Sequence, residues 1–356
     1  MAYTTIDDGS EYFQTALYTG NGTAIGSGGL TITNDGNSDL KPDWIWHKKR
    51  GNAESHAVAD SNRGTNKGIF PNENNAESTG GNEYVNSFNT DGFTVGNVGW
   101  ANDSSQTYVA WQWKANGGTT SSNNDGSITT TVQANTTAGF SIVTYTGNAT
   151  NGATIGHGLG AVPQVIIKKN RADNGTEWNV YHHSIGNTKS LFLNTTEAAT
   201  TESAYNNTSP TSSIQTINGS GANNGDGDNM VAYFFTPIKG YSKFGSYTGN
   251  GNADGAFIYT GFKPAWLMIK RTDSAQNWIL TDSTRNTFNL ASKRLFPNLN
   301  DAEATSSGTN DFDLVSNGFK CRTNHVEINT SGGTYIYIAF AEHPFVSSKG
   351  APTTAR

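Results

Sequence analysis

The sequence predicts an all-β protein made of three tandem modules, each a β-sandwich or jelly roll. Three observations predict this fold. The stretch Tyr-Thr-Gly-Asn occurs at residues 18–21, 145–148 and 247–250. Short runs rich in aromatic and β-branched residues recur between turn residues, which is typical of strands. No stretch long enough for a helix of several turns combines helical periodicity with good helix formers.

Further sequence marks follow each Tyr-Thr-Gly-Asn stretch in the same order. Each copy continues with a proline, an apolar run and cations, in the stretches KPDWIWHKKR, VPQVIIKKNR and KPAWLMIKRT. Next come IFPNENNAE, LFLNTTEAA and LFPNLNDAE, and the copies close on the aromatic strands YVAWQW, MVAYFF and YIAFAE. A structural unit can be copied, whereas a catalytic site normally occurs once. The repetition therefore indicates modules rather than active sites.

These marks divide the chain into six segments. They are an N-terminal lead that is a candidate docking segment (1–15), module 1 (16–117), a linker (118–138), module 2 (139–240), module 3 (241–346) and a C-terminal tail (347–356). The linker is rich in Gly, Ser, Thr and Asn, which predicts an extended or loosely ordered connection. Modules 2 and 3 meet almost without a spacer, so we expect them to pack against each other.

Composition supports β cores joined by many turns. The 356 residues are 34% hydrophobic and 15% charged, and they include 41 Gly and eight Trp. Low charge combined with 11% aromatic residues does not fit the disordered class. Aromatic and β-branched residues can fill the cores, while Gly, Asn and Asp form the turns.

Charge and cysteine content exclude several classes of partner and site. The net charge is −6, and the longest basic block is HKKR at residues 47–50. Binding to nucleic acid or to an anionic membrane surface needs a basic surface, so neither is expected. One cysteine excludes a disulfide within the chain and a cysteine-based zinc site. We see neither a secretory signal nor an apolar run that could insert into a membrane.

The repeats resemble modules of a known class of viral proteins. The opening MAYTTIDDGSEYFQTALYTGNG, the runs KPDWIWHKKR and YVAWQWKANGG, and the ending AFAEHPFVSSKGAPTTAR are similar to repeat modules in tail-fibre and virion structural proteins of marine tailed bacteriophages. The resemblance covers essentially the whole chain. It implies concanavalin-like β-sandwich modules in a virion protein that is made in the host cytoplasm. It brings no set of catalytic residues and no cofactor.

The expected function is therefore structural and non-enzymatic. The leading hypothesis is a tail-fibre or fibre-like surface component that mediates assembly and host contact through repeated modules, with multivalency raising avidity. The alternatives are a capsid decoration or cement protein and a glycan-binding protein or depolymerase. Expected partners are other virion proteins of the tail or capsid, a host surface glycan, and further copies of this chain in a homo-oligomer, with a trimer considered first.

Carboxylates in matching positions are the first candidate catalytic residues, because a glycosidase needs two of them at one sugar bond. Asp60 and Asp282 occupy equivalent positions in copies one and three, as do Glu77 and Glu303; copy two has His182 and Ala199 there. A pair replaced in one copy is either a degraded site or a set of surface and turn residues. We interpret these carboxylates as surface or turn residues and predict no catalytic site.

Metal ligands are similarly weak candidates. Asp226 and Asp228 in NNGDGDNM echo a calcium loop, but the spacing and the Glu of a full loop are missing. A turn before the MVAYFF strand explains them, so no metal site is predicted. His182 and His183 are adjacent, so on a strand they would point to opposite faces and could not share a metal.

Aromatic and basic residues complete the candidates. Most tryptophans are expected to fill sandwich cores, including Trp44, Trp46, Trp111 and Trp113. Trp100 lies outside the shared marks, and it is the weak candidate for a glycan or receptor contact. The basic stretches 47–50 and 168–171 are expected to be solvated charge at strand ends. In Tyr-Thr-Gly-Asn, the Tyr closes a strand and the Gly-Asn step supplies a tight turn.

Overall fold

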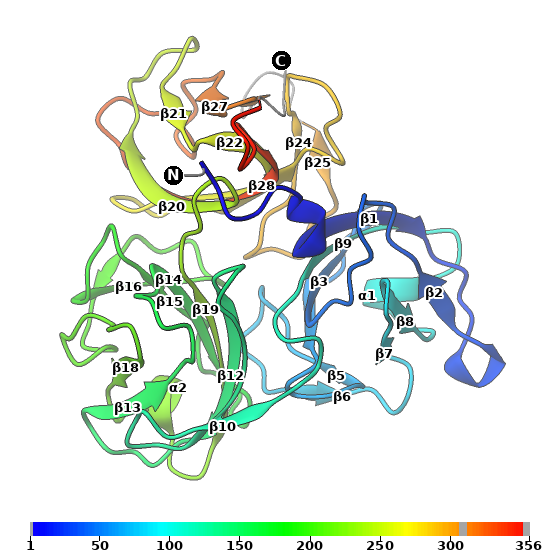
Figure 1. The fold of residues 1–356 in the computed structure, drawn as a ribbon, viewed down its shortest axis with the longest axis vertical. Helices are drawn as coiled ribbons and strands as arrows, with labels where there is room; N and C mark the ends of the chain where they lie inside the picture. Colours follow the sequence, from blue (N-terminus) through cyan, green and yellow to red (C-terminus); the bar gives the residue numbers. More distant parts are fainter. Residues whose placement is uncertain (1–2, 306–311, 352–356) are drawn as a thin grey trace.

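The structure is a computed structural model that describes residues 3–305 and 312–351. Almost all of its regular elements are antiparallel strands, and the prediction of an all-β sandwich fold is confirmed. Within the described residues, no helix is long and apolar enough to cross a membrane. Figure 1 shows three groups of strands arranged around a common centre, and each group corresponds to one copy of the repeated sequence.

The first group contains short helices and nine strands. They are η1 (Gly9–Glu11), β1 (Phe13–Thr19), η2 (Ile25–Ser27), β2 (Leu30–Ile32), β3 (Trp44–Lys49), β4 (Ala57–Asp60), β5 (Lys67–Gly68), β6 (Ser78–Thr79), β7 (Val85–Phe88), β8 (Phe93–Val95), α1 (Gly99–Asn102) and β9 (Thr107–Trp113).

The second group has the largest sheet. Its elements are β10 (Ser121–Asn123), β11 (Thr130–Asn135), β12 (Phe140–Thr146), β13 (Ala153–Gly156), β14 (Val165–Asn170), β15 (Asn179–His182), β16 (Lys189–Phe192), β17 (Thr200–Thr201), β18 (Ile214–Ile217), α2 (Gly221–Asn224) and β19 (Asn229–Phe235).

The third group is built like the first. Its strands are β20 (Ser242–Thr248), β21 (Phe257–Tyr259), β22 (Phe262–Arg271), β23 (Trp278–Asp282), β24 (Lys293–Arg294), β25 (Ala304–Thr305), β26 (Phe312–Val315), β27 (Gly318–Cys321) and β28 (Thr334–Pro344).

The three groups share one strand order. The four strands run β1-β9-β3-β4 in module 1, β12-β19-β14-β15 in module 2 and β20-β28-β22-β23 in module 3. A smaller sheet accompanies each of them, with the orders β2-β8-β7, β13-β18 and β21-β27-β26. The apolar runs after each proline form the central strands β3, β14 and β22. Their side chains are buried on both faces almost throughout, as the continuous apolar pattern requires.

Of the two forms expected for the linker at 118–138, extended or loosely ordered, the structure shows the extended one. This segment contains β10 and β11, and β11 pairs with β12 in the register Val132↔Val143. The two strands extend the sheet of module 2 to eight strands. Val132 and Thr130 are buried, so the segment is held by burial as well as by backbone hydrogen bonds. The small polar residues of the linker therefore cover a sheet edge that would otherwise be unpaired.

The N-terminal lead packs against the modules, and its role as a docking segment stays a prediction. Thr4 Oγ1 donates to the carbonyl of Lys239 over 2.7 Å, and Ile6 is 3% exposed in the main apolar cluster. The backbone N–H of Ser348 donates to Asp7 Oδ1 over 2.6 Å. Residues near both ends of the chain therefore meet on module 3 (Figure 1), and Phe13, placed in the lead by the sequence, begins β1.

A single aromatic cluster joins the three modules at the centre. Trp44 of module 1 and Tyr233 of module 2 have ring centroids 4.8 Å apart, and Phe235 and Phe340 join modules 2 and 3 at 5.8 Å. Trp113 and Trp266 join modules 1 and 3 at 5.5 Å. The tryptophans were expected to fill sandwich cores. Trp44, Trp46, Trp111 and Trp113 are indeed buried, but they fill a core that three modules share.

The Tyr-Thr-Gly-Asn stretches end β1, β12 and β20, and their glycines allow close packing. A Cβ on Gly147 would lie 2.1 Å from the carbonyl oxygen of Gly225, and Gly20 and Gly249 have equally close backbone neighbours at 2.2 Å. None of these three glycines has positive φ. The expectation that the Gly-Asn step supplies unusual turn angles is therefore wrong. Only glycine fits because another backbone approaches it.

Candidate functional site

The same loop of each module contacts the next module around the ring. The loops are residues 70–77, 192–199 and 296–303. The backbone N–H groups of Glu77, Ala199 and Glu303 donate to the carbonyls of Arg171, Thr272 and Arg50 over 2.8, 2.9 and 2.9 Å. Module 1 thus contacts module 2, module 2 contacts module 3, and module 3 contacts module 1. These heterologous contacts close into a ring with pseudo-threefold symmetry inside one chain.

One buried lysine crosses each of these contacts. Lys169, Lys270 and Lys48 each lie six residues after the shared proline. Their Nζ atoms donate to the carbonyls of Asn74, Thr196 and Asn300 in the neighbouring loop over 3.3, 3.1 and 3.3 Å. Burial lowers the pKa of each amine to about 8. The expectation of solvated charge at these strand ends is wrong, because carbonyls of the next module replace the water.

The contact between modules 1 and 2 is completed by a buried ion network. Arg63 Nε donates to Asp60 Oδ2 over 2.5 Å, and Arg63 Nη1 donates to Glu77 Oε2 over 2.7 Å. From module 2, Arg171 Nη2 donates to Glu77 Oε1 over 2.8 Å and Tyr233 Oη donates to Asp60 Oδ2 over 2.6 Å. Burial alone would raise the pKa of Glu77, but the two guanidinium groups hold it below its usual range.

The contact between modules 3 and 1 repeats this network. Arg285 Nε donates to Asp282 Oδ2 over 2.5 Å, and Arg285 Nη1 donates to Glu303 Oε2 over 3.0 Å. From module 1, Arg50 Nη2 donates to Glu303 Oε1 over 2.9 Å and Trp111 Nε1 donates to Asp282 Oδ2 over 3.0 Å. Asp60 and Asp282 are fully buried, so their interpretation as surface residues is wrong. Each does hold a turn, because its Oδ1 accepts from the backbone N–H of the arginine three residues later. Each carboxylate also joins two modules.

The contact between modules 2 and 3 lacks this network. His182, Ile185 and Ala199 occupy the positions of the Asp, Arg and Glu. His182 is fully buried, and its Nε2 lies 3.3 Å from the carbonyl oxygen of Tyr337. Burial lowers the pKa of His182 to about 3, so this imidazole is neutral near pH 7. This contact therefore has no counterpart of the buried Asp–Arg–Glu network, and Lys270 is the buried cation that crosses it.

A cavity of about 460 Å³ lies at this third contact, and it is the candidate binding site. Most of its lining residues bear a hydroxyl group, and they are joined by one acid and one lysine: Ser184, Ile185, Lys189, Ala199, Ser246, Tyr247, Thr248, Thr272, Asp273, Thr334, Tyr335 and Ile336. Ile185 and Ala199 stand where the other contacts have Arg and Glu. Their shorter side chains leave space that the ion networks fill elsewhere, and the lining suits hydrogen bonding to a polar ligand.

The prediction that His182 and His183 point to opposite faces is also wrong. Their rings stack with centroids 5.1 Å apart and an interplanar angle of 28°. His182 is the last residue of β15, so the alternation of a strand no longer applies to His183. His183 Nε2 lies 3.1 Å from the carbonyl oxygen of Phe244 in module 3. Both histidines thus contribute to the contact between modules 2 and 3.

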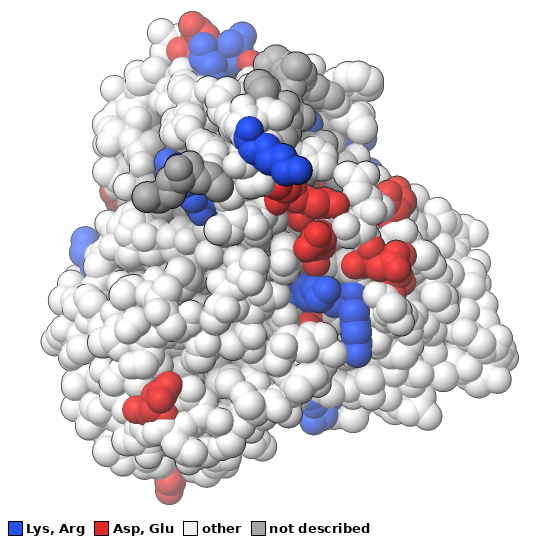
Figure 2. Space-filling model, in the orientation of Figure 1, with Lys and Arg blue, Asp and Glu red and all other residues white. Residues whose placement is uncertain are grey.

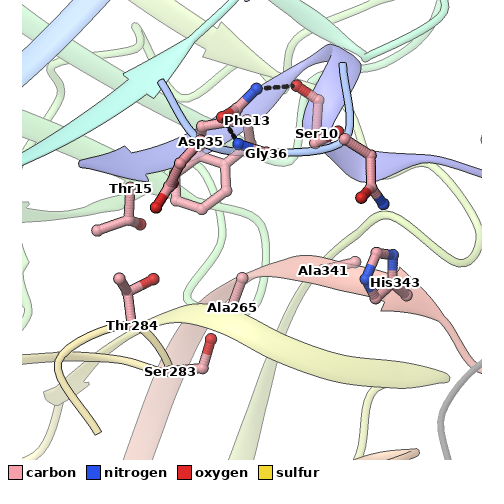
Figure 3. Close-up of a pocket in the computed structure, with 12 residues that line it drawn as sticks. Ser10, Phe13, Thr15, Asp35, Gly36, Ala265, Ser283, Thr284, Ala341 and His343 are labelled. Carbon is pink, nitrogen blue, oxygen red and sulfur yellow. Dashed lines mark hydrogen bonds between the residues drawn. The ribbon is translucent and has the colours of Figure 1, made fainter. Parts of the chain in front are cut away.

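A second, smaller cavity of about 190 Å³ separates modules 1 and 3. Figure 3 shows Thr15 and Asp35 from module 1 facing Ser283, Thr284 and Ala265 from module 3. Gln14 supports the module 1 side, because its side-chain Nε2 donates to the Ser10 carbonyl over 2.9 Å and its Oε1 accepts from Gly36 N over 3.0 Å. This cavity also lies between modules. A further cavity of about 480 Å³ lies within module 2, where Asn179 and Glu202 are among its lining residues.

Trp100 does not form the exposed contact that the sequence suggested. It is 5% exposed in α1 and packs against Tyr84 and His47, with ring centroids 5.0 and 5.3 Å away. The ring belongs to the inner core of module 1. The prediction that Trp100 is exposed and could contact a glycan or receptor is therefore wrong.

Asp226 and Asp228 lie on the turn between α2 and β19. Asp226 is exposed, and Asp228 Oδ2 accepts a hydrogen bond from Asn170 Nδ2 over 2.7 Å. Over residues 3–305 and 312–351, no group of three or more His, Cys, Asp or Glu side chains is arranged to hold a metal ion. The hydrogen bond gives Asp228 a role in holding the turn against β14.

The face shown in Figure 2 is mostly uncharged. Its acidic and basic side chains form one group where modules 1 and 3 meet and another at the top of module 3, with single charges elsewhere.

Sequence reasoning missed the arginines of the two networks, although a signal was present. The pattern Asp-x-x-Arg occurs at Asp60–Arg63 and at Asp282–Arg285, and copy two lacks both residues. Copy two also lacks the following Glu. The joint loss of three ionisable residues in one copy indicates that they act together, as a network does.

Comparisons with known proteins identify a family. No curated protein matches the chain, and no solved structure matches it. One family model matches residues 8–344, which span all three modules. The chain therefore belongs to the family described as Domain of unknown function (DUF7483).

Proposed function

We propose that the protein is a structural component of a tailed-bacteriophage virion, namely a tail-fibre or fibre-like surface protein that mediates assembly and host contact. The observation that carries this proposal is the closed ring of three modules. A ring fixed by a shared core presents three similar sets of loops in a constant arrangement. Several weak contacts in such an arrangement add up to strong attachment without one strong site.

The loops after the Tyr-Thr-Gly-Asn stretches are the best candidates for these contacts. Residues 21–24, 148–152 and 250–254 are exposed or half-buried, and their sequences differ among the copies. The strands before them are held in place by the shared core. A rigid scaffold with variable exposed loops is the usual arrangement for a binding surface.

Purified virions test this proposal. Mass spectrometry of particles from the source phage should find the protein, and antibody labelling should place it on the tail. Hundreds of copies on the head would favour the capsid decoration alternative. Absence from the particle would refute both virion proposals.

Homo-oligomerisation remains part of the proposal, but it would use other surfaces. All three contacts between modules are made within one chain. A trimer of the whole chain would need contacts outside them. Light scattering on the purified chain gives the mass of the assembly. A monomer at micromolar concentration would contradict homo-oligomerisation.

Glycan binding is a second candidate function, favoured by the cavity of about 460 Å³ between modules 2 and 3. Its hydroxyl-rich lining can hydrogen-bond sugar hydroxyls. Calorimetry with host surface oligosaccharides should show binding that is lost in the double variant Ile185→Arg/Ala199→Glu, which fills the cavity. Binding that survives this variant would exclude the cavity. Release of reducing ends from host polysaccharide would instead indicate a depolymerase.

A further inference from the structure

A polar cluster lies inside module 2 and belongs to none of the contacts between modules. It consists of Lys168 on β14, Asn179 on β15, Ser190 on β16, and Glu202 and Tyr205 after β17. Lys168, Asn179, Ser190 and Tyr205 are at most 1% exposed. Tyr205 belongs to the apolar core between the two sheets of module 2. Polar groups in such a core are costly unless they are paired or have a chemical role.

The Lys168 amine lacks a hydrogen-bond partner among the described residues. Its Nζ lies 4.9 Å from the centroid of the Tyr205 ring. The neighbouring Lys169 differs, because its Nζ donates to the carbonyls of Asn170 and Thr176. Burial lowers the pKa of Lys168 to about 7, against an opposing effect of Glu202. A large share of this amine is therefore neutral at neutral pH, and a neutral, desolvated amine is a nucleophile.

Asn179 lies directly opposite Lys168 across the strand pair β14–β15. Residues opposite each other in an antiparallel pair have Cβ atoms about 4.5–5.5 Å apart and point to the same face. The four-carbon stem of lysine spans such a separation. The Lys168 amine and the Asn179 carboxamide therefore lie on the same face of the sheet, and both residues are buried. Asn179 and Glu202 also line a cavity of about 480 Å³.

The carboxamide of Asn179 is held at both ends. Tyr205 Oη donates to Asn179 Oδ1 over 2.6 Å, and Ser190 Oγ donates to Tyr205 Oη over 3.1 Å. Asn179 Nδ2 donates to Glu202 Oε1 over 2.8 Å. A donor on the carbonyl oxygen stabilises negative charge that develops there, and a carboxylate beside the nitrogen can carry protons.

We infer that Lys168 and Asn179 become joined by an intramolecular isopeptide bond, with Glu202 as the proton carrier and Tyr205 as the hydrogen-bond donor to the oxyanion. The neutral Lys168 amine attacks Asn179 Cγ, and the carbonyl electron pair moves to Oδ1. Glu202 takes a proton from Nζ and delivers it to Nδ2. The oxyanion then reforms the carbonyl, the Cγ–Nδ2 bond breaks and ammonia leaves. An amine and a primary amide become a secondary amide and ammonia, so the step needs no oxidant and no cofactor.

The other two modules serve as internal comparisons. The equivalent opposed residues are His47 and Ala57 in module 1, and Ile269 and Ile279 in module 3. Neither pair can form an amide. The inference therefore predicts a single cross-link, between the central strand β14 of module 2 and the neighbouring strand β15. It does not depend on the proposed virion function.

Peptide mapping of the purified full-length chain tests the inference. After denaturation and trypsin digestion, cleavage after Lys168 should be lost. The peptide 115–169, which contains Lys168 and ends at Lys169, should remain joined to the peptide 172–189. The pair should be lighter by about 17 Da, the mass of one ammonia molecule released in the acyl transfer. Recovery of Lys168 and Asn179 on separate peptides of unchanged mass would overturn the inference, and this result does not depend on any variant.

Variants separate the roles. Lys168→Met and Asn179→Ala should each abolish the joined peptide, and Glu202→Gln should abolish it or slow its appearance many-fold. Lys239→Met is the matched control, because Lys239 is an exposed lysine of the same module that lies outside both joined peptides, and it should leave the joined peptide unchanged. A joined peptide that persists in Asn179→Ala would identify another acceptor and contradict the pairing.

Discussion

Arg63 and Asp60 form a fully buried ion pair, with Nε of the arginine 2.5 Å from Oδ2 of the carboxylate. The pair lies where two modules meet, and Tyr233 of the second module donates to the same carboxylate oxygen. Arg285 and Asp282 repeat the pair at another contact of the ring. Two of the three contacts between modules therefore depend on charges that are shielded from water.

Removing either arginine should destabilise the ring. Arg63→Met or Arg285→Met leaves a buried carboxylate without its cation, which costs about 3–5 kcal/mol. Chemical denaturation monitored by tryptophan fluorescence measures the loss. Arg322→Met is the control, because Arg322 is a more exposed residue whose ion pair with Asp254 is at the surface, and it should cost less than about 1 kcal/mol. Equal effects of Arg63→Met and Arg322→Met would contradict the role of the network.

The glycine of the Tyr-Thr-Gly-Asn stretch should not tolerate a side chain. Gly147→Ala places a Cβ 2.1 Å from the Gly225 carbonyl oxygen, so one backbone must move, at a cost of about 1–3 kcal/mol. Thermal unfolding detects this as a lower Tm. Gly221→Ala is the matched control in the same module, because a Cβ there meets no atom within 4 Å. If the two variants unfold at the same temperature, close packing is not the reason for the glycine.

Acid should destabilise the fold through its buried imidazoles. Burial lowers the pKa of His47 and of His182 to about 3, from an ordinary value near 6.5. Between these values the unfolded chain binds more protons than the folded chain. Stability from these groups is therefore full above pH 6.5 and is lost as the pH falls toward 3. Each contributes about 1.4 kcal/mol per pH unit well inside this window.

His182→Gln tests this pH dependence at one site. When it unfolds near pH 5, the variant should bind about one proton fewer than the wild type does. Denaturation midpoints at pH 7, 6 and 5 give the slope of stability against pH for the wild type and for the variant. An identical slope for both proteins would show that His182 becomes protonated without unfolding.

The N-terminal lead should contribute to stability. Ile6 is 3% exposed in the shared core, so Ile6→Ala should cost about 2–4 kcal/mol through lost burial and a cavity. The adjacent Thr5 is exposed, and Thr5→Ala should stay within about 0.5 kcal/mol of the wild type. An Ile6→Ala protein as stable as the wild type would contradict a role of the lead in the shared core.

The candidate cavity could be located only in part from the sequence. Alignment of the copies shows that His182 and Ala199 replace carboxylates, and that Ile185 replaces an arginine. It does not show that these positions face module 3. Their meaning depends on Tyr337 and Thr272, which lie far along the chain and meet them only in the ring.

The sequence by itself determined the β class, the three copies and the central apolar strands. These follow from local residue preferences and from repetition, which are visible without any long-range contact. The tertiary structure alone decided that the copies close into a ring, that Lys48, Lys169 and Lys270 are buried, and that Trp100 is hidden. The physical reason is that burial depends on which surfaces meet. A lysine at a strand end is solvated on an isolated module, but it is dehydrated and bonded to carbonyls when the next module covers it.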